Sequence, residues 1–432
     1  MKASLRLLTK RRFAPLFATQ LLGAFNDNLF KNAMVLFVVY SVYSDPRAET
    51  WFSALATAAA TLPFFLLSAL SGQLADQRDK AAIIRLVKLA EIGIMLVGAA
   101  GLMMAWLGYA VEVVAIPLMM VAMLAMGIHS TFFGPIKYAI LPQHLEDDEV
   151  LGGTGLVEAG TYIAILAGTI LAGLIHVEMA AVVVLAIACI GYATGRMVPP
   201  APPLAEPVKL DFHIVRASAR LVNATLHIPR LFLAILSISF FWTIGTVLFI
   251  QFPPLVKNVL SADKAIASLF LGIFSVGVAI GSILINRMLQ GHVSAKFAPV
   301  SVLAMGGFVI AFHVICSLWD SGLPVGQLMS LHDFLAHDHA VSLVLVLLGI
   351  AVSGGMFVVP LYAFLTTTVE KSQAARTVAA NNIVNSGAMV IGAVITLGMS
   401  AAGIDVVNQL LFTASMTIVS AFLAQKLHLA CD

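Results

Sequence analysis

The first long apolar stretch of the chain, residues 13–43, contains an unusual group of polar side chains. At 100° per residue of helix, Gln20, Asp27 and Lys31 lie within about 40° of one another on one face. Asn28 flanks that face. Asp27 follows the start of the stretch by roughly 21 Å along a helix axis, which places it near the middle of a bilayer. A charge at that depth is costly unless it faces a cavity or a partner, so this face predicts a binding site.

The residue types indicate what such a site would bind. Lys31 suits a phosphate, and Asp27 suits an amine or a hydroxyl, which together make a site of the size of a zwitterion. The alternative is structural, because Asp27 and Lys31 are one helical turn apart and can neutralise each other while packing two helices. The density of polar groups on one face favours the binding site.

A second acidic residue, Glu158, lies two turns into the apolar stretch 151–175, and Tyr162 follows one turn later. Glu158 can complete the same cavity or pair with Lys31. It can equally be a structural partner near the cytoplasmic end of its helix. We therefore include Glu158 and Tyr162 among the candidate substrate-binding residues.

The apolar stretches after residue 230 have no acidic or basic residue that we expect deep in the membrane. They offer Trp242 within an aromatic cluster, and Asn381 and Asn385, which share a helix face. Charge in one half of the chain and neutral, apolar surface in the other would suit an amphiphile. The alternative is that the aromatic residues merely face lipid.

A mixed-charge tract follows the second apolar stretch and contains Gly72, Asp76, Arg78 and Lys80. An acidic residue at this place can face the positive N-terminus of a neighbouring helix, and basic residues can form ion pairs with it. Such a contact would lock one conformation, so we predict that these four residues act in conformational gating. A solvated loop of mixed charge is the alternative.

The composition indicates which elements position these residues. Of the 432 residues, 60% are hydrophobic and only 11% are charged, whereas a soluble domain is nearer a quarter charged. This excludes an ordinary cytosolic enzyme, a disordered protein and a nucleic-acid binder. The expected fold is an all-α membrane protein of twelve transmembrane helices, at about 13–43, 51–74, 82–107, 114–137, 151–175, 179–198, 231–256, 265–289, 297–318, 341–366, 377–401 and 404–425.

The basic residues predict the orientation. Of the 24 Lys and Arg residues, all but four fall at the termini or in the loops on the same side as the termini. Three of the exceptions, Arg47, Lys257 and Lys264, lie on the opposite side, and Lys31 is inside the first span. Because positive charge is retained inside, both termini are expected to be cytoplasmic.

The long cytoplasmic stretch, residues 199–230, opens with a run of prolines that cannot continue a helix. Further along it, Arg216, Arg220 and Leu221 suggest a short amphipathic helix on the membrane surface. This linker divides the chain into an N-terminal half, residues 1–198, and a C-terminal half, residues 231–432. Two pseudo-symmetric six-helix halves with a site near the midplane are a common transporter plan.

Two further groups favour a structural reading. Glu91 lies one turn from Lys88 near the start of the third span, where pairing close to the interface is the simpler interpretation. The loop 319–340 holds three histidines and two aspartates that can bind a metal, although a solvated loop is the simpler reading. The three cysteines have no metal or disulfide spacing. We therefore expect no cofactor and no resident metal.

The mixed-charge tract resembles the loop-two-three motif of the major facilitator superfamily, Gly-x-Leu-Ala-Asp-Arg-x-Gly-Arg-Lys. Gly72, Leu74, Asp76 and Lys80 match that motif. Gln77 and Asp79 depart from it, which leaves the finer salt-bridge pattern open. With twelve spans in two halves, the resemblance covers the whole chain and implies the major facilitator fold.

Three tracts together, residues 20–28, 132–142 and 354–361, are similar to the bacterial lysophospholipid transporter family and to the transporter portion of acyltransferase fusions. The resemblance implies that lysophosphatidylethanolamine and lysophosphatidylglycerol move from the outer to the inner leaflet of the bacterial inner membrane. A cytoplasmic acyltransferase and acyl-carrier-protein synthetase would then reacylate them. By resemblance, Asp27 and Asn28 line the head-group site. A monomer in contact with membrane lipids is expected.

Two other function classes were weighed. A proton-coupled exporter of small amphiphilic compounds would use Asp27 or Glu158 as the proton carrier. A lipid-remodelling enzyme is disfavoured, since the sequence has no His-x4-Asp pair, no Gly-x-Ser-x-Gly motif and no Gly-x4-Gly-Lys phosphate loop. The expected function is therefore transport without catalysis.

Overall fold

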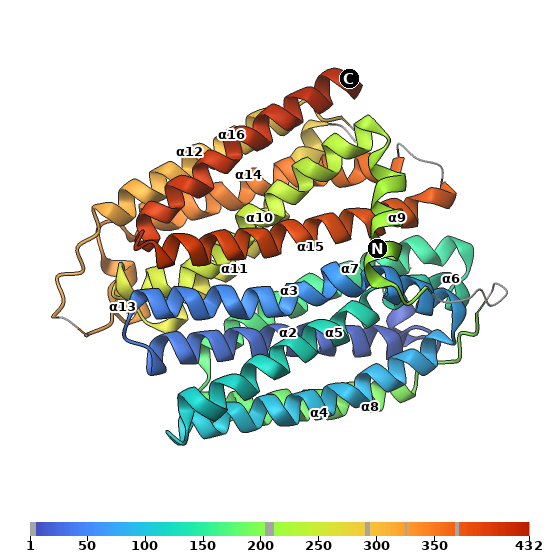
Figure 1. Cartoon of the computed structure of the whole chain (residues 1–432), viewed down its shortest axis with the longest axis horizontal. Helices are drawn as coiled ribbons and strands as arrows, with labels where there is room; N and C mark the ends of the chain where they lie inside the picture. The colour runs from blue at the N-terminus through green and yellow to red at the C-terminus, as the bar shows by residue number, and fades with distance from the viewer. Residues whose placement is uncertain (1–5, 204–210, 290–293, 325, 368–370, 432) are drawn as a thin grey trace. The chain divides into compact units, whose positions relative to one another are not determined.

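The computed structural model describes residues 6–203, 211–289, 294–324, 326–367 and 371–431 (Figure 1). These residues are helical throughout, apart from loops and one isolated β-bridge between Ala262 and Met329. The elements are η1 Arg6–Thr9, α2 Ala14–Phe37, η2 Val38–Val42, α3 Pro46–Gln77, α4 Lys80–Trp106, η3 Val111–Ala115, α5 Ile116–Ala139, α6 Leu141–His144, α7 Asp147–Leu174, α8 Val177–Arg196, α9 Ile214–Leu226, α10 Pro229–Asn258, α11 Lys264–Met288, α12 Ala298–Ser317, α13 Leu331–Ala336, α14 Ala340–Thr367, α15 Lys371–Ala401 and α16 Val406–Cys431. The predicted all-α class is confirmed.

Ten helices in the described part of the chain are long and apolar enough to cross a membrane. They are α3, α4, η3 with α5, α8, α10, α11, α12, α14, α15 and α16. The other two predicted spans are also helical. In α7 the apolar part is Ala159–Leu174, and α2 is less apolar because it carries the polar face noted above.

The residues pack into two compact units. Unit 1 comprises Met1–Met34 and Leu62–Ala217, and unit 2 comprises Val35–Thr61 and Ser218–Asp432. The end of α2 and the first part of α3 therefore pack with residues that follow the linker. The division at the linker into residues 1–198 and 231–432 stays a prediction.

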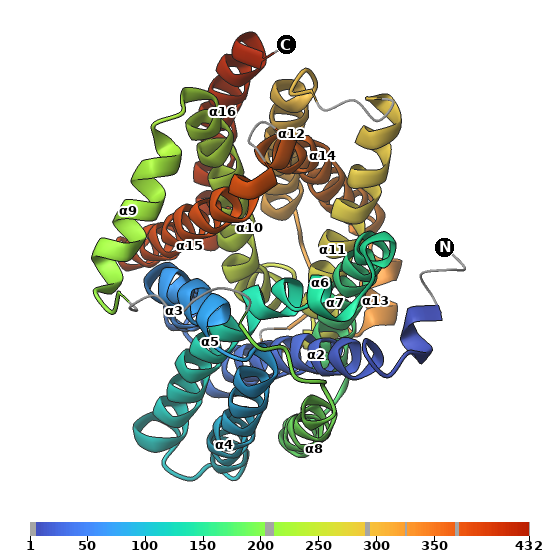
Figure 2. The same cartoon turned by 90° about the vertical axis from the view of Figure 1, so that its right-hand side faces the viewer.

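Within unit 1, α4 packs against α5 and α8, which Figures 1 and 2 show lying alongside it. An apolar core cluster lies near the start of α2 and includes Phe13, Leu16, Ile84, Ile136 and Val157. This packing brings α2, α4, α5 and α7 together, and these are the helices that carry the polar residues of the candidate site.

Within unit 2, α12 packs against α14 and α16, and α10 packs against α15 and α16 (Figures 1 and 2). The closest approach is between α11 and α14. A Cβ added at Gly355 would lie 2.2 Å from the Val278 carbonyl oxygen, so only glycine fits there. The tract 354–361, which carried part of the family resemblance, thus serves helix packing in this structure.

The linker begins as an ordered, non-helical segment. Lys80 donates its backbone N–H to the Ala201 carbonyl at 3.0 Å, and Arg85 donates to the Val198 carbonyl at 3.1 Å. Further along, the predicted amphipathic helix is confirmed as α9, in which Val215 is exposed. Its position on the membrane surface stays a prediction.

Candidate functional site

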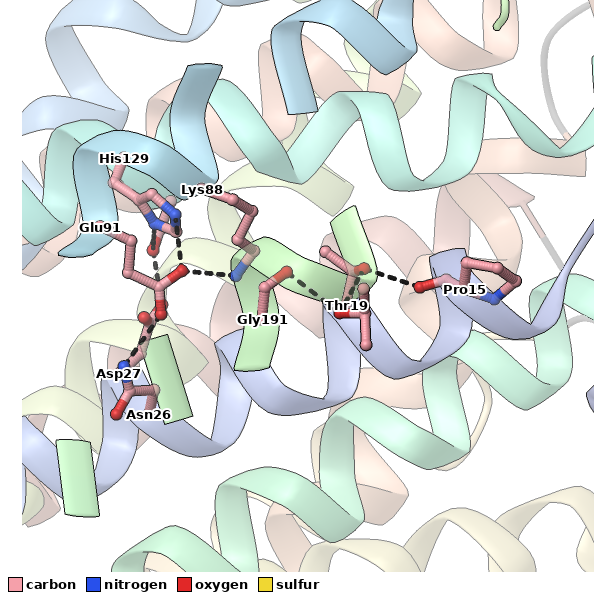
Figure 3. Close-up of polar contacts among 10 residues, drawn as sticks. Pro15, Thr19, Asn26, Asp27, Lys88, Glu91, His129 and Gly191 are labelled. Atoms are coloured by element: carbon pink, nitrogen blue, oxygen red, sulfur yellow. Dashed lines mark hydrogen bonds and ion pairs between the residues drawn. The ribbon is translucent and has the colours of Figure 1, made fainter. Parts of the chain in front are cut away.

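A buried ion pair on α4 is the centre of the polar network in unit 1 (Figure 3). The Lys88 Nζ atom lies 2.6 Å from Glu91 Oε2, and both side chains are at most 1% exposed. Helical spacing of three residues places the two groups on one face of α4. The pairing agrees with the sequence prediction. Their position near the membrane interface stays a prediction, and both groups are fully enclosed by neighbouring helices.

Groups from two more helices contact the same carboxylate. Asn26 of α2 donates its Nδ2 to Glu91 Oε1 at 2.9 Å. His129 of α5 places Nε2 at 3.2 Å from Glu91 Oε2. Figure 3 shows these side chains converging on Glu91. Glu91 therefore joins α2, α4 and α5 in the interior of unit 1.

Glycine residues of α2 and α8 form a groove that leaves room for the Lys88 side chain. A Cβ added at Gly23 of α2 would lie 2.5 Å from Lys88 Nζ. The aliphatic part of Lys88 passes Gly191 and Gly195 of α8, where an added Cβ would come within 4 Å of it. The amine also lies 5.0 Å from the centre of the Phe133 ring, an arrangement that favours a cation.

Asp27 lies beside this network and is bound to α5. Ser130 donates its hydroxyl to Asp27 Oδ2 at 2.5 Å, while Asp27 Oδ1 is buried and has no hydrogen-bond partner among the described residues. The suggested pairing of Asp27 with Lys31 is not found: both are described residues, and no ion pair joins them. The physical reason is that the carboxylate turns toward α5, where a hydroxyl is within reach.

The other predicted residues of α2 make mainly local contacts. Asn28 donates Nδ2 to the Ala24 carbonyl at 2.8 Å, one turn earlier. Gln20 accepts a hydrogen bond from the Thr161 hydroxyl of α7 at 2.9 Å, and its Nε2 is buried without a partner. Lys137 of α5 donates to the same Thr161 oxygen at 3.3 Å. The structure thus connects Gln20 to α5 and α7.

Glu158 and Tyr162 lie on α7, but their side chains fall outside the described residues. Their roles as site residues stay predictions. The same holds for Lys31, for which the structure gives a place on α2 and no ion-pair partner among the described residues.

In unit 2 the predicted residues form a neutral network around a tyrosine. Trp242 of α10 donates Nε1 to the Tyr362 hydroxyl at 2.7 Å, and Asn385 of α15 donates Nδ2 to it at 3.3 Å. Ser239 of α10 donates to Asn385 Oδ1 at 2.7 Å. Asn381 is buried, and neither its amide nitrogen nor its oxygen has a partner.

The predicted gating tract is bound to the start of the linker through a different residue. Asp79 caps α4 by accepting from the Ala81 N–H at 2.9 Å, and it accepts from the Ala201 N–H at 3.0 Å. Lys80 is buried and Arg78 is exposed, whereas Gly72 has no close neighbour at its Cβ position. The Asp76 side chain lies outside the described residues, so the gating role stays a prediction.

The three histidines of the loop 319–340 do not all lie together, although the ring centres of His337 and His339 are 5.8 Å apart. His337 stacks on Trp319 with ring centres 3.9 Å apart, while His332 lies beside Asp333. Among the described residues, no three His, Cys, Asp or Glu side chains could hold a metal ion.

Comparison with known proteins decides the family. The sequence model of the Major Facilitator Superfamily matches residues 16–393. The chain belongs to the Major Facilitator Superfamily. It is accordingly a multi-pass membrane protein and a transporter, as the resemblance of the mixed-charge tract had implied.

Relatives and solved structures within the superfamily agree with this. The lysophospholipid transporter LplT of Citrobacter koseri is 25% identical over 387 residues, which cover 87% of this chain and 85% of the relative. The D-xylose-proton symporter has a TM-score of 0.69 at 13% identity, with 96% and 97% of the two chains covered. The human organic anion transporter MFSD10 has a TM-score of 0.65 at 15% identity, with 96% and 99% covered. These structural likenesses confirm the major facilitator fold.

Several residues of the polar networks in this superfamily member were not predicted. They are His129 and Ser130 on α5, Thr161 on α7, and Ser239 and Tyr362 in unit 2. One signal was available, since His129 and Ser130 are polar residues in an apolar span directly before the tract 132–142. Tyr362 is adjacent to the tract 354–361 in the same way.

Proposed function

We propose that this chain transports lysophospholipids. The observation that carries the proposal is the similarity to lysophospholipid transporters along 87% of this chain and 85% of the relative, which leaves little of either protein unmatched. The substrates would be lysophosphatidylethanolamine and lysophosphatidylglycerol. Their movement would be from the outer to the inner leaflet of the bacterial inner membrane, with both termini of the chain in the cytoplasm.

The polar residues of unit 1 support a head-group role. Asp27 has one oxygen that accepts from Ser130 and a second that has no hydrogen-bond partner in the described part of the chain. Gln20 likewise has an unsatisfied amide nitrogen. Buried polar atoms normally have partners, so unsatisfied ones in a transporter suit a bound ligand. An ammonium or hydroxyl group of the ligand would donate a hydrogen bond to Asp27, and a phosphate oxygen would accept one from the Gln20 amide.

The residues of unit 2 support a role with the acyl chain. Its predicted site residues, Trp242, Asn381 and Asn385, are neutral, and the hydrogen bonds of Trp242 and Asn385 go to Tyr362. An alkyl chain that covers a neutral surface does not remove water from a charged group, so it avoids that free-energy cost. Charged candidate residues in unit 1 and neutral candidate residues in unit 2 therefore suit a lipid with one polar and one apolar end.

The cellular context follows from the same proposal. Lysophospholipids delivered to the inner leaflet would be substrates for a cytoplasmic acyltransferase and acyl-carrier-protein synthetase. The chain itself would act as a monomer and would carry out no covalent chemistry, because reacylation needs a separate catalyst.

Purified protein in proteoliposomes tests the proposal. Fluorescent lysophosphatidylethanolamine and lysophosphatidylglycerol would be added outside, and their arrival at the inner leaflet followed by the gain of protection from an external quencher. We expect both lipids to move faster than in protein-free vesicles. Movement of a soluble amphiphilic drug with acidification of the vesicle lumen, and no lysolipid movement, would instead identify a proton-coupled exporter.

A further inference from the structure

Two pairs of consecutive residues face each other across α2 and α5. On α2 the pair is Asn26 and Asp27, and on α5 it is His129 and Ser130. Asp27 accepts a hydrogen bond directly from Ser130, whereas Asn26 donates one to Glu91 and His129 Nε2 lies within ion-pair distance of Glu91, at 3.2 Å. The two helices are therefore cross-linked twice at adjacent positions, once directly and once through a carboxylate of α4.

A double cross-link of this kind fixes rotation as well as distance. A single hydrogen bond between Asp27 and Ser130 would allow α2 to turn about its axis. The second link, through Glu91, removes that freedom, because Asn26 is 100° further round the helix than Asp27. The direction of Asp27 Oδ1 is thus set by Glu91, although no hydrogen bond joins these two described residues.

We propose that Glu91 is a positioning residue that orients Asp27 for the substrate head group. Lys88 neutralises the carboxylate, and His129 and Asn26 transmit its position to α5 and α2. This inference rests on the proposed function, since the head group is what Asp27 would bind. A site whose groups are held by supporting hydrogen bonds binds its ligand without first ordering them.

The test replaces the charged pair by apolar residues of similar length. Glu91→Gln alone would leave Lys88 buried and uncompensated and can prevent folding. The double variant Lys88→Met with Glu91→Leu removes both charges together, a change that buried pairs often tolerate. Glu112→Gln is the control, because Glu112 is exposed between α4 and α5.

If Glu91 positions Asp27, the double variant should give a specific result in proteoliposomes. The double variant folds and inserts, but its KM for lysophosphatidylethanolamine rises by about tenfold with little change in maximal rate. Its preference between the ethanolamine and glycerol head groups also changes, which a merely structural pair would not cause. Wild-type KM and preference in the folded double variant would overturn the proposal. Absence of lysolipid transport by the wild type would instead refute the proposed function.

A second, independent observation concerns a buried cluster in unit 2. Glu49, in the first turn of α3, is fully buried and accepts hydrogen bonds from Lys257 at 2.5 Å and from Asn258. Lys257 also donates to the backbone carbonyls of Val39, at 2.5 Å, and Tyr43, at 2.8 Å. The amine thus has three acceptors, and all belong to residues 39–49.

This cluster differs from ordinary packing of neighbouring helices because its residues are far apart in the sequence. Lys257 and Glu49 are 208 residues apart and lie on opposite sides of the linker in the chain, although both belong to unit 2. Val39 lies in η2, the π-helical end of α2. π-helical turns occur often at functional sites. Lys257 is also one of the few basic residues that the charge distribution places outside.

We infer that Glu49, Lys257 and Asn258 form an outer latch that closes the extracellular side of this transporter and opens during transport. Alternating access requires the segments before and after the linker to separate at each end in turn. Ionic groups suit such a contact, because water replaces their partners when it opens. An apolar contact of the same area has no such replacement.

Thiol labelling tests the outer latch without reference to any substrate. In a chain free of the native cysteines, Ala54→Cys provides the probe, since Ala54 is buried against Ile250 and Ala393. The variant Glu49→Gln with Lys257→Met should label several times faster with a membrane-impermeant reagent added outside. Arg47→Gln, which removes an exposed basic residue two positions from Glu49, should leave the labelling unchanged.

Unchanged labelling in the variant Glu49→Gln with Lys257→Met would overturn the inference. So would faster labelling only from the cytoplasmic side, because the cluster would then lie at the other end of the protein.

Discussion

The ion pairs Lys88–Glu91 and Lys257–Glu49 are both buried, but they are built in opposite ways. Lys88 and Glu91 are three residues apart on one helix, and side chains from α2 and α5 bind them. Lys257 and Glu49 come from distant parts of the chain, and backbone carbonyls complete the coordination of the amine.

Because of this difference, the Lys88–Glu91 pair can act as a permanent support, whereas the Lys257–Glu49 pair is a contact that can open. The Lys88–Glu91 pair stays together whatever the helices do, because one helix carries both charges. Its role is to hold the Glu91 carboxylate at a fixed position, where side chains of α2 and α5 contact it. The Lys257–Glu49 pair exists only while three segments are together, so its energy contributes to one conformation of the transporter and not to others.

The largest expected effect comes from breaking the pair on α4. Glu91→Gln leaves the Lys88 ammonium in a dry interior, and removing one member of a buried pair costs about 3–5 kcal/mol. Thermal unfolding of the purified protein in detergent should show a strong loss of stability. Glu49→Gln should cost less, since water can reach Lys257 when the outer latch opens. Equal losses in the two variants would remove the distinction between support and latch.

A second expected effect separates the site from its support. Asp27→Asn keeps an oxygen that can accept from Ser130, so folding should be little affected. The charge that would hold the head group is lost, and we expect lysolipid transport to fall to the background rate. Transport assays on matched amounts of inserted protein provide the measurement. Transport at the wild-type rate would reject Asp27 as a site residue, and failure to insert would favour a structural role.

A smaller effect is expected in the groove that holds Lys88. Gly23→Ala places a methyl group 2.5 Å from the Lys88 amine in the present geometry. Displacing a well-packed group in this way costs roughly 1–3 kcal/mol. Gly93→Ala on α4 is the control, because no atom lies within 4 Å of its added Cβ. Thermal unfolding should therefore separate the two variants, and equal stability would show that Lys88 can move aside.

The sequence was sufficient for the helices and for the polar face of α2. Apolar length predicts spans, and 100° periodicity predicts which residues share a face, because both depend on local geometry alone. The partner of Asp27 could not be predicted in this way. Ser130 is 103 residues away, and only the packing of α5 on α2 brings it to the carboxylate.

The burial of Lys88 and Glu91 among helices was not predicted, for a related reason. Their spacing shows that they can pair, but their burial depends on glycines of α2 and α8 that open a groove for the amine. Tyr362 was missed because it lies in an apolar span, where an aromatic residue normally predicts packing. Its hydroxyl acquires a role only when α10, α14 and α15 come together.

The most direct test of the central claim is the ratio of transport rates for one-chain and two-chain lipids. The account places charge recognition in unit 1 and a neutral surface for one alkyl chain in unit 2, so it predicts selection by the number of acyl chains. In proteoliposomes, lysophosphatidylethanolamine and lysophosphatidylglycerol should move at comparable rates, and their diacyl parents more slowly by about tenfold or more, a difference of about 1.4 kcal/mol. Equal rates for monoacyl and diacyl lipids would contradict the account.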